Sequence, residues 1–325
     1  MKMMKNNPWA AIPHNKQGID SVRVNPDNPF DFFWALGKNG EYLFIIEHDH
    51  IEDWPTKKIA LSGIDIQQFQ TSKGYRLSLM LNEPSDWDIF YILCHDLLQA
   101  TDEAATQKTM LSIIHNRLQR WQKLFRKFGK KLLTEQEQQG LMGELYFLKN
   151  HLLNIFSANE ALSFWKGPFG EQQDFGIGDT AVEVKSKQGT SAPYIQISSI
   201  DQLSCNTESC FLYVITLNAA PKSAENTISL NTIIHEIKEL LLNANEVDIF
   251  ENLLAEAGYM DLPEYDEKHY LISKESMFEV RDEFPRLLGD SVPNGVVSVQ
   301  YKIELKECKP FEITLDDFNT RLNNE

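Results

Sequence analysis

The chain has 325 residues, 42% of them hydrophobic, and its formal net charge is −16 from 31 basic and 47 acidic side chains. A chain of this length and composition can bury a sizeable core, and it predicts two or three domains. The acidic balance excludes a protein that binds nucleic acid with its whole surface, because that surface repels phosphate. Any contact with DNA therefore needs a local basic patch.

The cysteines and the N-terminal segment indicate a reduced, cytoplasmic protein. The four cysteines, Cys94, Cys205, Cys210 and Cys308, form no Cys-x-x-Cys pair, which favours free thiols over a disulfide or zinc framework. The first residues lack the apolar region of a signal peptide, and no apolar run is long enough to span a bilayer. We therefore predict a cytoplasmic protein that has no membrane partner.

The first 95 residues are predicted to form a β-rich region. Strands at 30–36 and 41–47 flank an Asn-Gly pair, which is a strong hairpin signal. A second hairpin is predicted from the strands at 64–69 and 75–81. No group of side chains in this region has catalytic spacing.

A helical region follows, with one buried helix from about residue 87 and a longer one that Asp102 and Glu103 cap and Gly129 ends. The second half of the longer helix is basic and has no acidic residue. These charges either form a solvated helix face, with the aromatic side chains packed inward, or bind the phosphate backbone of DNA. The basic residues are Arg117, Arg120, Lys123, Arg126, Lys127, Lys130 and Lys131.

The next helix carries a glutamate in an unusual position. Thr134 and Glu137 form a capping box that begins the helix, and four leucines from Leu141 onward form its apolar stripe. Glu144 lies at the edge of this stripe, roughly 40° from Leu148 at 3.6 residues per turn. A glutamate on the core side of a helix costs free energy unless it is paired or binds a metal.

A predicted hairpin brings further charged side chains together. Residues 180–186 alternate apolar and polar, so they form a strand with Glu183 and Lys185 on one face. A turn at 176–179 lets Asp174 lie alongside Glu183. Two carboxylates and a lysine at a sheet edge fit a Mg²⁺ site. Taken alone, this spacing also fits an exposed ion pair in an acidic chain.

The remaining elements are predicted from periodicity. Gln196, on a strand at 194–198, either joins the site as an auxiliary polar group or faces solvent. A short helix at 199–203 and a buried strand at 211–216 follow. The rest consists of helices at 230–243 and 247–257 and strands at 270–272, 277–280 and 296–305.

These motifs resemble the PD-(D/E)XK nuclease superfamily and, more narrowly, the bacterial "PD-(D/E)XK motif protein" family. One departure is that Gln173, not proline, precedes Asp174. The resemblance covers most of the chain and is weakest at the N-terminus. It rests on Gly143-Glu144-Leu145, Trp165-x-Gly167-Pro168, Asp174-Phe175, Glu183-Val184-Lys185-Ser186, residues 195–199 with Gln202-Leu203, Phe284-Pro285-Arg286-Leu287 and Val299-Gln300-Tyr301.

The resemblance implies an α/β (α+β) fold with a restriction-endonuclease-like core and a mixed sheet. On this basis we expect a β-rich N-terminal domain at 1–95, a helical linker and nuclease core at 96–228, and a C-terminal α/β extension at 229–325.

The resemblance also implies a Mg²⁺-dependent DNA endonuclease, in which Mn²⁺ can replace Mg²⁺. Asp174, Glu183 and the carbonyl of Val184 would hold the metal. Glu144 would support it directly, through water or through a second ion; the sequence does not distinguish one metal from two. Lys185 would orient or activate the attacking water.

Two alternatives belong to other classes: a catalytically silent nuclease-like scaffold, and a DNA-binding or adaptor subunit. The resemblance places the family in bacterial restriction or phage-defence systems, so further subunits such as an ATPase are expected partners. This chain has no glycine-rich phosphate-binding loop, so we do not expect it to hydrolyse ATP itself.

Overall fold

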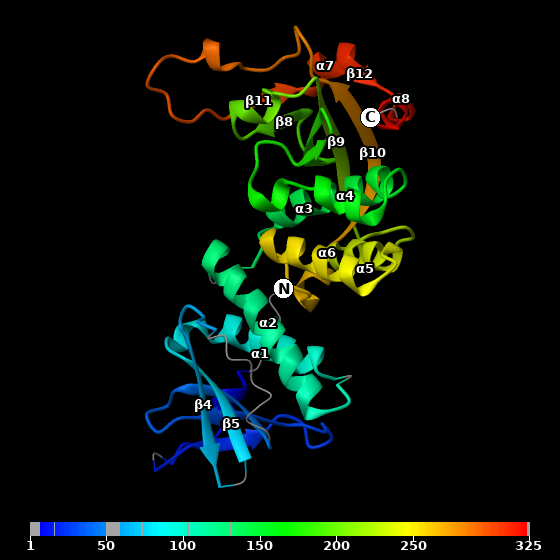
Figure 1. Ribbon diagram of the computed structural model, residues 1–325. Coiled ribbons are helices and arrows are strands. Elements are labelled where there is room, and N and C mark those ends of the chain that lie inside the picture. Colours follow the sequence, from blue (N-terminus) through cyan, green and yellow to red (C-terminus); the bar gives the residue numbers. More distant parts are fainter. Residues whose placement is uncertain are drawn as a thin grey trace. The chain divides into compact units, whose positions relative to one another are not determined.

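The computed structural model describes residues 7–15, 17–49, 59–72, 74–102, 104–129 and 132–323. The chain divides into two compact units, Met1–Leu132 and Leu133–Glu325 (Figure 1). Among the described helices, none is long and apolar enough to cross a membrane. The finer division of the chain at 95/96 and 228/229 stays a prediction.

The first unit contains a five-stranded antiparallel sheet with the strand order β1-β2-β3-β5-β4. Both predicted hairpins are confirmed, since β2 pairs with β3 and β4 pairs with β5. The aromatic side chains of Phe32 and Phe44 are buried in the core. The strands are β1 (Asp20–Arg23), β2 (Asp31–Leu36), β3 (Tyr42–His48), β4 (Ile64–Thr71) and β5 (Gly74–Leu81).

Two helices complete the first unit, α1 (Trp87–Ala100) and α2 (Gln107–Phe128). The prediction that Asp102 and Glu103 cap α2 is wrong. The helix begins later because the Thr106 side chain accepts the backbone N–H of Thr109 and so supplies the N-cap. The predicted end at Gly129 is confirmed.

The second unit is built on a mixed five-stranded sheet with the order β12-β10-β9-β7-β6. The β7–β9 pair is parallel and the other pairs are antiparallel, so the predicted mixed sheet and α/β class are confirmed. A separate two-stranded sheet pairs β8 with β11. The strands are β6 (Phe175–Ile177), β7 (Thr180–Gln188), β8 (Tyr194–Ile197), β9 (Ser209–Ala220), β10 (His269–Glu279), β11 (Tyr301–Glu304) and β12 (Glu312–Ile313).

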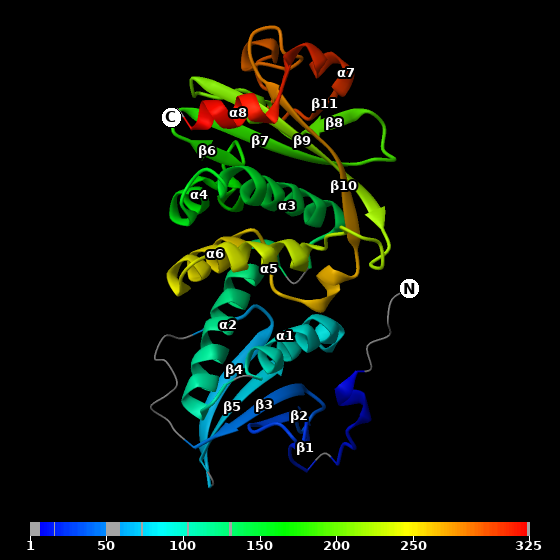
Figure 2. The ribbon, with the colours of Figure 1, turned by 90° about the vertical axis from the view of Figure 1, so that its right-hand side faces the viewer.

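Helices and the small sheet cover the two faces of this mixed sheet (Figure 2). Helix α3 packs on one face, where a Cβ at Gly143 would lie only 2.1 Å from Ser186 Oγ. Glycine therefore lets α3 approach β7 closely. On the other face, β8, β11 and α7 bury an apolar cluster that includes Ile197, Val214 and Phe278. The helices are α3 (Glu135–Phe147), α4 (Ala158–Phe164), α5 (Leu230–Leu240), α6 (Ala244–Glu256), α7 (Leu305–Cys308) and α8 (Leu315–Leu322).

Three sequence predictions in the second unit need correction. The predicted strands at 270–272 and 277–280 form one continuous strand, β10, and the predicted strand at 296–305 is shortened to Tyr301–Glu304. The predicted absence of disulfides is also wrong, because a disulfide joins Cys205 to Cys210. The segment after residue 203 turns back onto β9 and brings the two Cα atoms to 5.8 Å.

Candidate active site

The β6–β7 hairpin brings Asp174 beside the Glu183-x-Lys185 strand. Phe175 and Val182 are register partners, so Asp174, which directly precedes β6, lies next to the middle of β7. The Val184 backbone N–H donates to Asp174 Oδ2 at 2.8 Å. This hydrogen bond fixes the carboxylate of Asp174 against the strand that carries Glu183.

Glu144 reaches the same place from α3. Its Oε2 accepts a hydrogen bond from Trp165 Nε1 at 2.7 Å. A Cβ at Gly167 would lie 2.4 Å from Glu144 Oε2 and 3.2 Å from Asp174 Oδ1, so both carboxylates converge on this glycine. The Trp165-x-Gly167 motif therefore serves two purposes: the indole orients Glu144, and the missing side chain leaves room for two carboxylates.

Glu183 and Lys185 form a buried ion pair. Lys185 Nζ donates to Glu183 Oε1 at 2.6 Å, and the Glu183 side chain is only 1% exposed. The other carboxylate oxygen, Glu183 Oε2, is buried and has no hydrogen-bond partner among the residues that the structure describes. A buried acceptor without a partner is costly, and a bound cation would satisfy it.

Burial is the main cause of the raised pKa values of the three carboxyl groups in this cluster. Burial, followed by the charge of Asp174, raises the pKa of Glu144 to about 8. Burial likewise raises the pKa of Asp174, despite the lowering effect of Lys185 and the Val184 N–H. The pKa of Glu183 lies well above its usual range because of burial first and the charge of Asp174 second, despite the lowering effect of Lys185. One lysine does not balance three acids.

The chemistry of this donor set fits a divalent cation. Within the described ranges, no three His, Cys, Asp or Glu side chains already have a metal-binding arrangement. However, Glu183 Oε2 has no hydrogen-bond partner in the described part of the chain, and a hard cation would both satisfy this oxygen and favour the charged forms of the buried carboxyl groups. The carbonyl of Val184 stays a predicted ligand.

The structure separates Gln196 from this group and brings in Gln202 instead. Gln196 is exposed on β8, where its register partner is Lys302 of β11. Gln202 Oε1, in contrast, lies 3.2 Å from Lys185 Nζ. Sequence reasoning missed this contact, although Gln202 is one of the residues that carry the family resemblance.

The basic helix α2 belongs to the first unit. Arg117 donates to Asp96, whose side chain is only 1% exposed, so this arginine is part of a buried ion pair. Arg126 and Lys127 are exposed, while Arg120 and Lys123 are half-buried. The predicted contributions of Lys130 and Lys131 lie outside the described residues.

Comparisons with known proteins point to one family. The family model described as "Putative PD-(D/E)XK family member, (DUF4420)" matches residues 5–306 of the chain. Searches of curated proteins and of solved structures gave no match.

Proposed function

The chain belongs to the family described as "Putative PD-(D/E)XK family member, (DUF4420)", whose model covers residues 5–306, and from this premise we propose that it is a Mg²⁺-dependent DNA endonuclease. The observation that carries the proposal is the convergence of Asp174, Glu183 and Lys185, in which one buried oxygen of Glu183 has no partner within the described ranges. Perturbed carboxyl pKa values in a cluster with a lysine are typical of catalytic sites.

In this proposal Asp174, Glu183 and the carbonyl of Val184 hold Mg²⁺, or Mn²⁺ in its place, and Glu144 supports the metal. When bound, the metal polarises the phosphodiester and lowers the pKa of a bound water. Lys185 directs an N–H toward the attacking water or a phosphate oxygen and offsets the negative charge that develops there. Trp165 holds the Glu144 carboxylate toward Gly167 through its indole N–H.

The test is metal-dependent cleavage by the purified full-length protein. Supercoiled plasmid is incubated with Mg²⁺, with Mn²⁺ or with EDTA, and nicked and linear products are measured on gels. We expect cleavage with either metal, none with EDTA, and none from Glu183→Ala. A wild-type protein that cleaves neither double-stranded nor single-stranded DNA with either metal would overturn the proposal.

We further propose that the protein acts in the cytoplasm as a component of a bacterial restriction or anti-phage defence system. The support is the family resemblance, which links such chains to these systems. In this setting, other subunits such as an ATPase would be its partners. Co-purification from cells that express the neighbouring genes tests this part, and a protein that purifies from those cells without any of the neighbouring gene products would contradict it.

One observation favours a second candidate function, a nuclease-like scaffold or DNA-binding adaptor that does not cleave. Lys185 already pairs with Glu183, which lowers the need for a metal at one of the two glutamate oxygens. Binding assays in EDTA separate the two candidates. A silent adaptor binds DNA or a protein partner equally well with and without metal, and Glu183→Ala does not affect its function.

A further inference from the structure

The ammonium group of Lys185 is held by two acceptors. It donates to Glu183 Oε1 at 2.6 Å and to Gln202 Oε1 at 3.2 Å. A lysine ammonium has three N–H donors, so two are directed at protein atoms and one is left for the substrate side. Because Glu183 lies on the same strand two residues away, Gln202 is the acceptor that comes from a different element and fixes the direction of the side chain.

The chemistry of the contacts settles which atom of the Gln202 amide faces Lys185. The Ser198 backbone N–H donates to Gln202 Oε1 at 2.8 Å, and the Lys185 ammonium donates to the same atom. Both neighbours can only donate, so the atom between them is the oxygen. The backbone bond from Ser198 therefore orients the amide before any substrate arrives.

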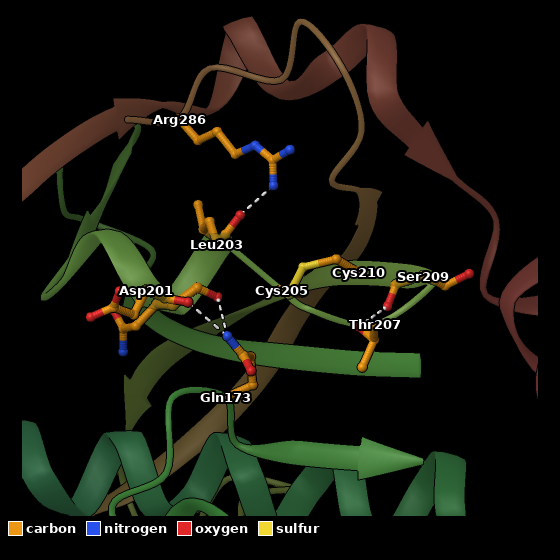
Figure 3. Close-up of a disulfide and its surroundings, with 9 residues drawn as sticks. Gln173, Asp201, Leu203, Cys205, Thr207, Ser209, Cys210 and Arg286 are labelled. Carbon is orange, nitrogen blue, oxygen red and sulfur yellow. Dashed lines mark hydrogen bonds between the residues drawn. A yellow bond between two sulfur atoms is a disulfide. The ribbon is translucent and has the colours of Figure 1, made fainter. Parts of the chain in front are cut away.

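The short 3₁₀ helix that carries Gln202, Ile200–Leu203, is itself fixed from two sides (Figure 3). Gln173 Nε2 donates to the Asp201 carbonyl at 2.7 Å. From the C-terminal part of the chain, Arg286 Nη1 donates to the Leu203 carbonyl. Beyond these two contacts, the Cys205–Cys210 disulfide joins the following segment to β9.

We propose that Gln202 is a positioning residue for Lys185 and that Arg286 keeps Gln202 in place by holding the carbonyl of Leu203. The inference rests on the proposed nuclease function and deepens it. Gln202 does not touch the metal or the reacting phosphate; it sets where the Lys185 ammonium points. A neutral amide does this without neutralising the charge that Lys185 offers to the substrate.

The proposal gives a role to two sequence features that the metal site leaves unexplained. Arg286 is the arginine of the Phe-Pro-Arg-Leu motif, 83 residues from the carbonyl that it holds. Gln173 occupies the position where the superfamily motif has proline, and its side-chain amide reaches the backbone of the Gln202 segment. Proline has no side-chain donor and cannot make this contact.

The closeness of Arg286 to Lys185 has independent support. Tyr301, in the second C-terminal motif, is half-buried, and burial raises the pKa of its hydroxyl. The charges of both Arg286 and Lys185 act in the opposite direction on this same group. The two cations therefore lie near one side chain, and the C-terminal segment contributes to the surroundings of the catalytic lysine.

The first experiment compares Gln202→Met with wild-type protein in steady-state plasmid cleavage with Mn²⁺. Methionine keeps the length of the side chain but has no amide oxygen, so Lys185 loses its orienting acceptor. We expect kcat to fall about tenfold to a hundredfold, in line with a misplaced catalytic group, and KM to change little. An unchanged kcat would overturn the proposal.

A second measurement does not depend on cleavage and therefore separates failure of this inference from failure of the proposed function. The order parameter of the Lys185 ammonium is measured by NMR in wild-type, Gln202→Met and Gln202→Glu proteins. We expect greater mobility in Gln202→Met and wild-type order in Gln202→Glu, which keeps an acceptor oxygen at the same reach. Equal mobility in all three would overturn the positioning role even in an active nuclease.

Arg286→Ala tests the second half of the proposal, with Arg281→Ala as the matched control. Arg281 is exposed in the same C-terminal segment and lies over the ring of Phe311. We expect Arg286→Ala to lower kcat and to mobilise the Lys185 ammonium, and Arg281→Ala to do neither. A raised KM with unchanged kcat in Arg286→Ala would show that Arg286 binds the nucleic acid directly, which would overturn its assignment here.

Discussion

Two buried carboxylates, Asp96 in the first unit and Glu183 in the second, have the same exposure but differ in how many of their oxygens accept hydrogen bonds. Each side chain is 1% exposed and has a cationic partner. Both carboxylate oxygens of Asp96 accept hydrogen bonds from Arg117, and Oδ2 also accepts one from Trp121 Nε1 at 2.8 Å. Only one carboxylate oxygen of Glu183 accepts a hydrogen bond from Lys185, and its other oxygen has no partner in the described part of the chain.

The difference contrasts a buried carboxylate in a structural ion pair with one in the proposed catalytic site. A buried ion pair whose hydrogen bonds are complete holds elements together, and removing one partner leaves an uncompensated charge. A buried carboxylate that has acidic neighbours and an oxygen without a hydrogen-bond partner can be stabilised by a bound cation. Such an arrangement is typical of a catalytic site. Substitutions should therefore affect stability at Asp96 and activity at Glu183.

The largest effect is expected for Glu183→Ala and Asp174→Ala. Each removes a proposed metal ligand, and we expect plasmid cleavage to fall by at least about a thousandfold, because the metal supplies several kcal/mol of transition-state stabilisation. Calorimetric titration with Mn²⁺ should show a site that both variants lack, while circular dichroism stays unchanged. Glu171→Ala, which removes an exposed carboxylate near Asp174, is the control. Wild-type cleavage by Glu183→Ala would place the active site elsewhere.

Lys185→Ala should lose cleavage while it retains the metal. An ammonium does not ligate Mg²⁺, so Mn²⁺ affinity by calorimetry should persist while the rate falls by about 10²–10⁴, the usual contribution of a positioned proton-transfer group. Lys185→Arg should restore the rate only in part, since a planar guanidinium does not replace a compact ammonium. Lys187→Ala, on the same strand, should behave as wild type. If Lys185→Ala also failed to bind Mn²⁺, local misfolding would explain the loss of activity better than a missing cation.

Asp96→Ala should destabilise the first unit without any direct effect on cleavage chemistry. Arg117 and Trp121 would lose the buried carboxylate to which both donate, and we expect a loss of roughly 3 kcal/mol in the free energy of unfolding. Urea unfolding measures it. The control is Asp31→Ala, because the Arg23–Asp31 pair is exposed and such pairs contribute at most about 1 kcal/mol. If both variants lost the same free energy of unfolding, the buried Asp96–Arg117 pair would contribute no more to stability than an exposed pair, which would contradict this prediction.

The carboxylate cluster should make stability depend on pH. The pKa of Glu144 is about 8 in the folded protein, above its usual 4.5, so the folded state binds the proton more tightly than the unfolded state. Its contribution to stability is therefore present below about pH 4.5 and is lost as pH rises to about 8. Thermal unfolding of metal-free protein from pH 5 to 9 checks this, and Glu144→Gln should flatten the profile. A wild-type profile in Glu144→Gln would assign the pH dependence to other groups.

The smallest effect concerns the basic helix α2, which we propose binds the phosphate backbone. Neutralising Arg120, Lys123 and Lys127 together should weaken DNA binding equally for all sequences. The slope of log affinity against log salt should fall by up to about 0.9 for each phosphate that the variant no longer neutralises. Removing Lys222, Lys268 and Lys306 instead changes net charge equally and is the control. An unchanged slope in the α2 variant would assign these charges to a solvated face.

Local patterns in the sequence predicted the scaffold of the candidate site well. The Thr134–Glu137 capping box and the β6–β7 hairpin depend on residues within a few positions of one another, and both are confirmed. The alternation along β7 predicts that Glu183 and Lys185 share a face, and their ion pair agrees with this. Short-range hydrogen bonding and side-chain periodicity are sufficient for such features.

The interactions that complete the candidate site could not be predicted in this way. Gln202 reaches Lys185 across 17 residues, and its approach depends on the geometry of the turn after Ser198. The Trp165–Glu144 hydrogen bond depends on how the chain between α4 and β6 folds over α3. The Cys205–Cys210 disulfide was missed because cysteine spacing alone does not show where the chain turns back. Each of these depends on tertiary packing.

The crowding of two carboxylates against Gly167 has a consequence for inherited variation. A single methyl group at this position would meet Glu144 Oε2 at 2.4 Å, and the end of that flexible side chain would have to move away. No charge would be removed and no backbone atom displaced, so the chain would still fold. An allele that changes only this codon would then produce a folded protein in which only the Glu144 carboxylate of the candidate site is displaced.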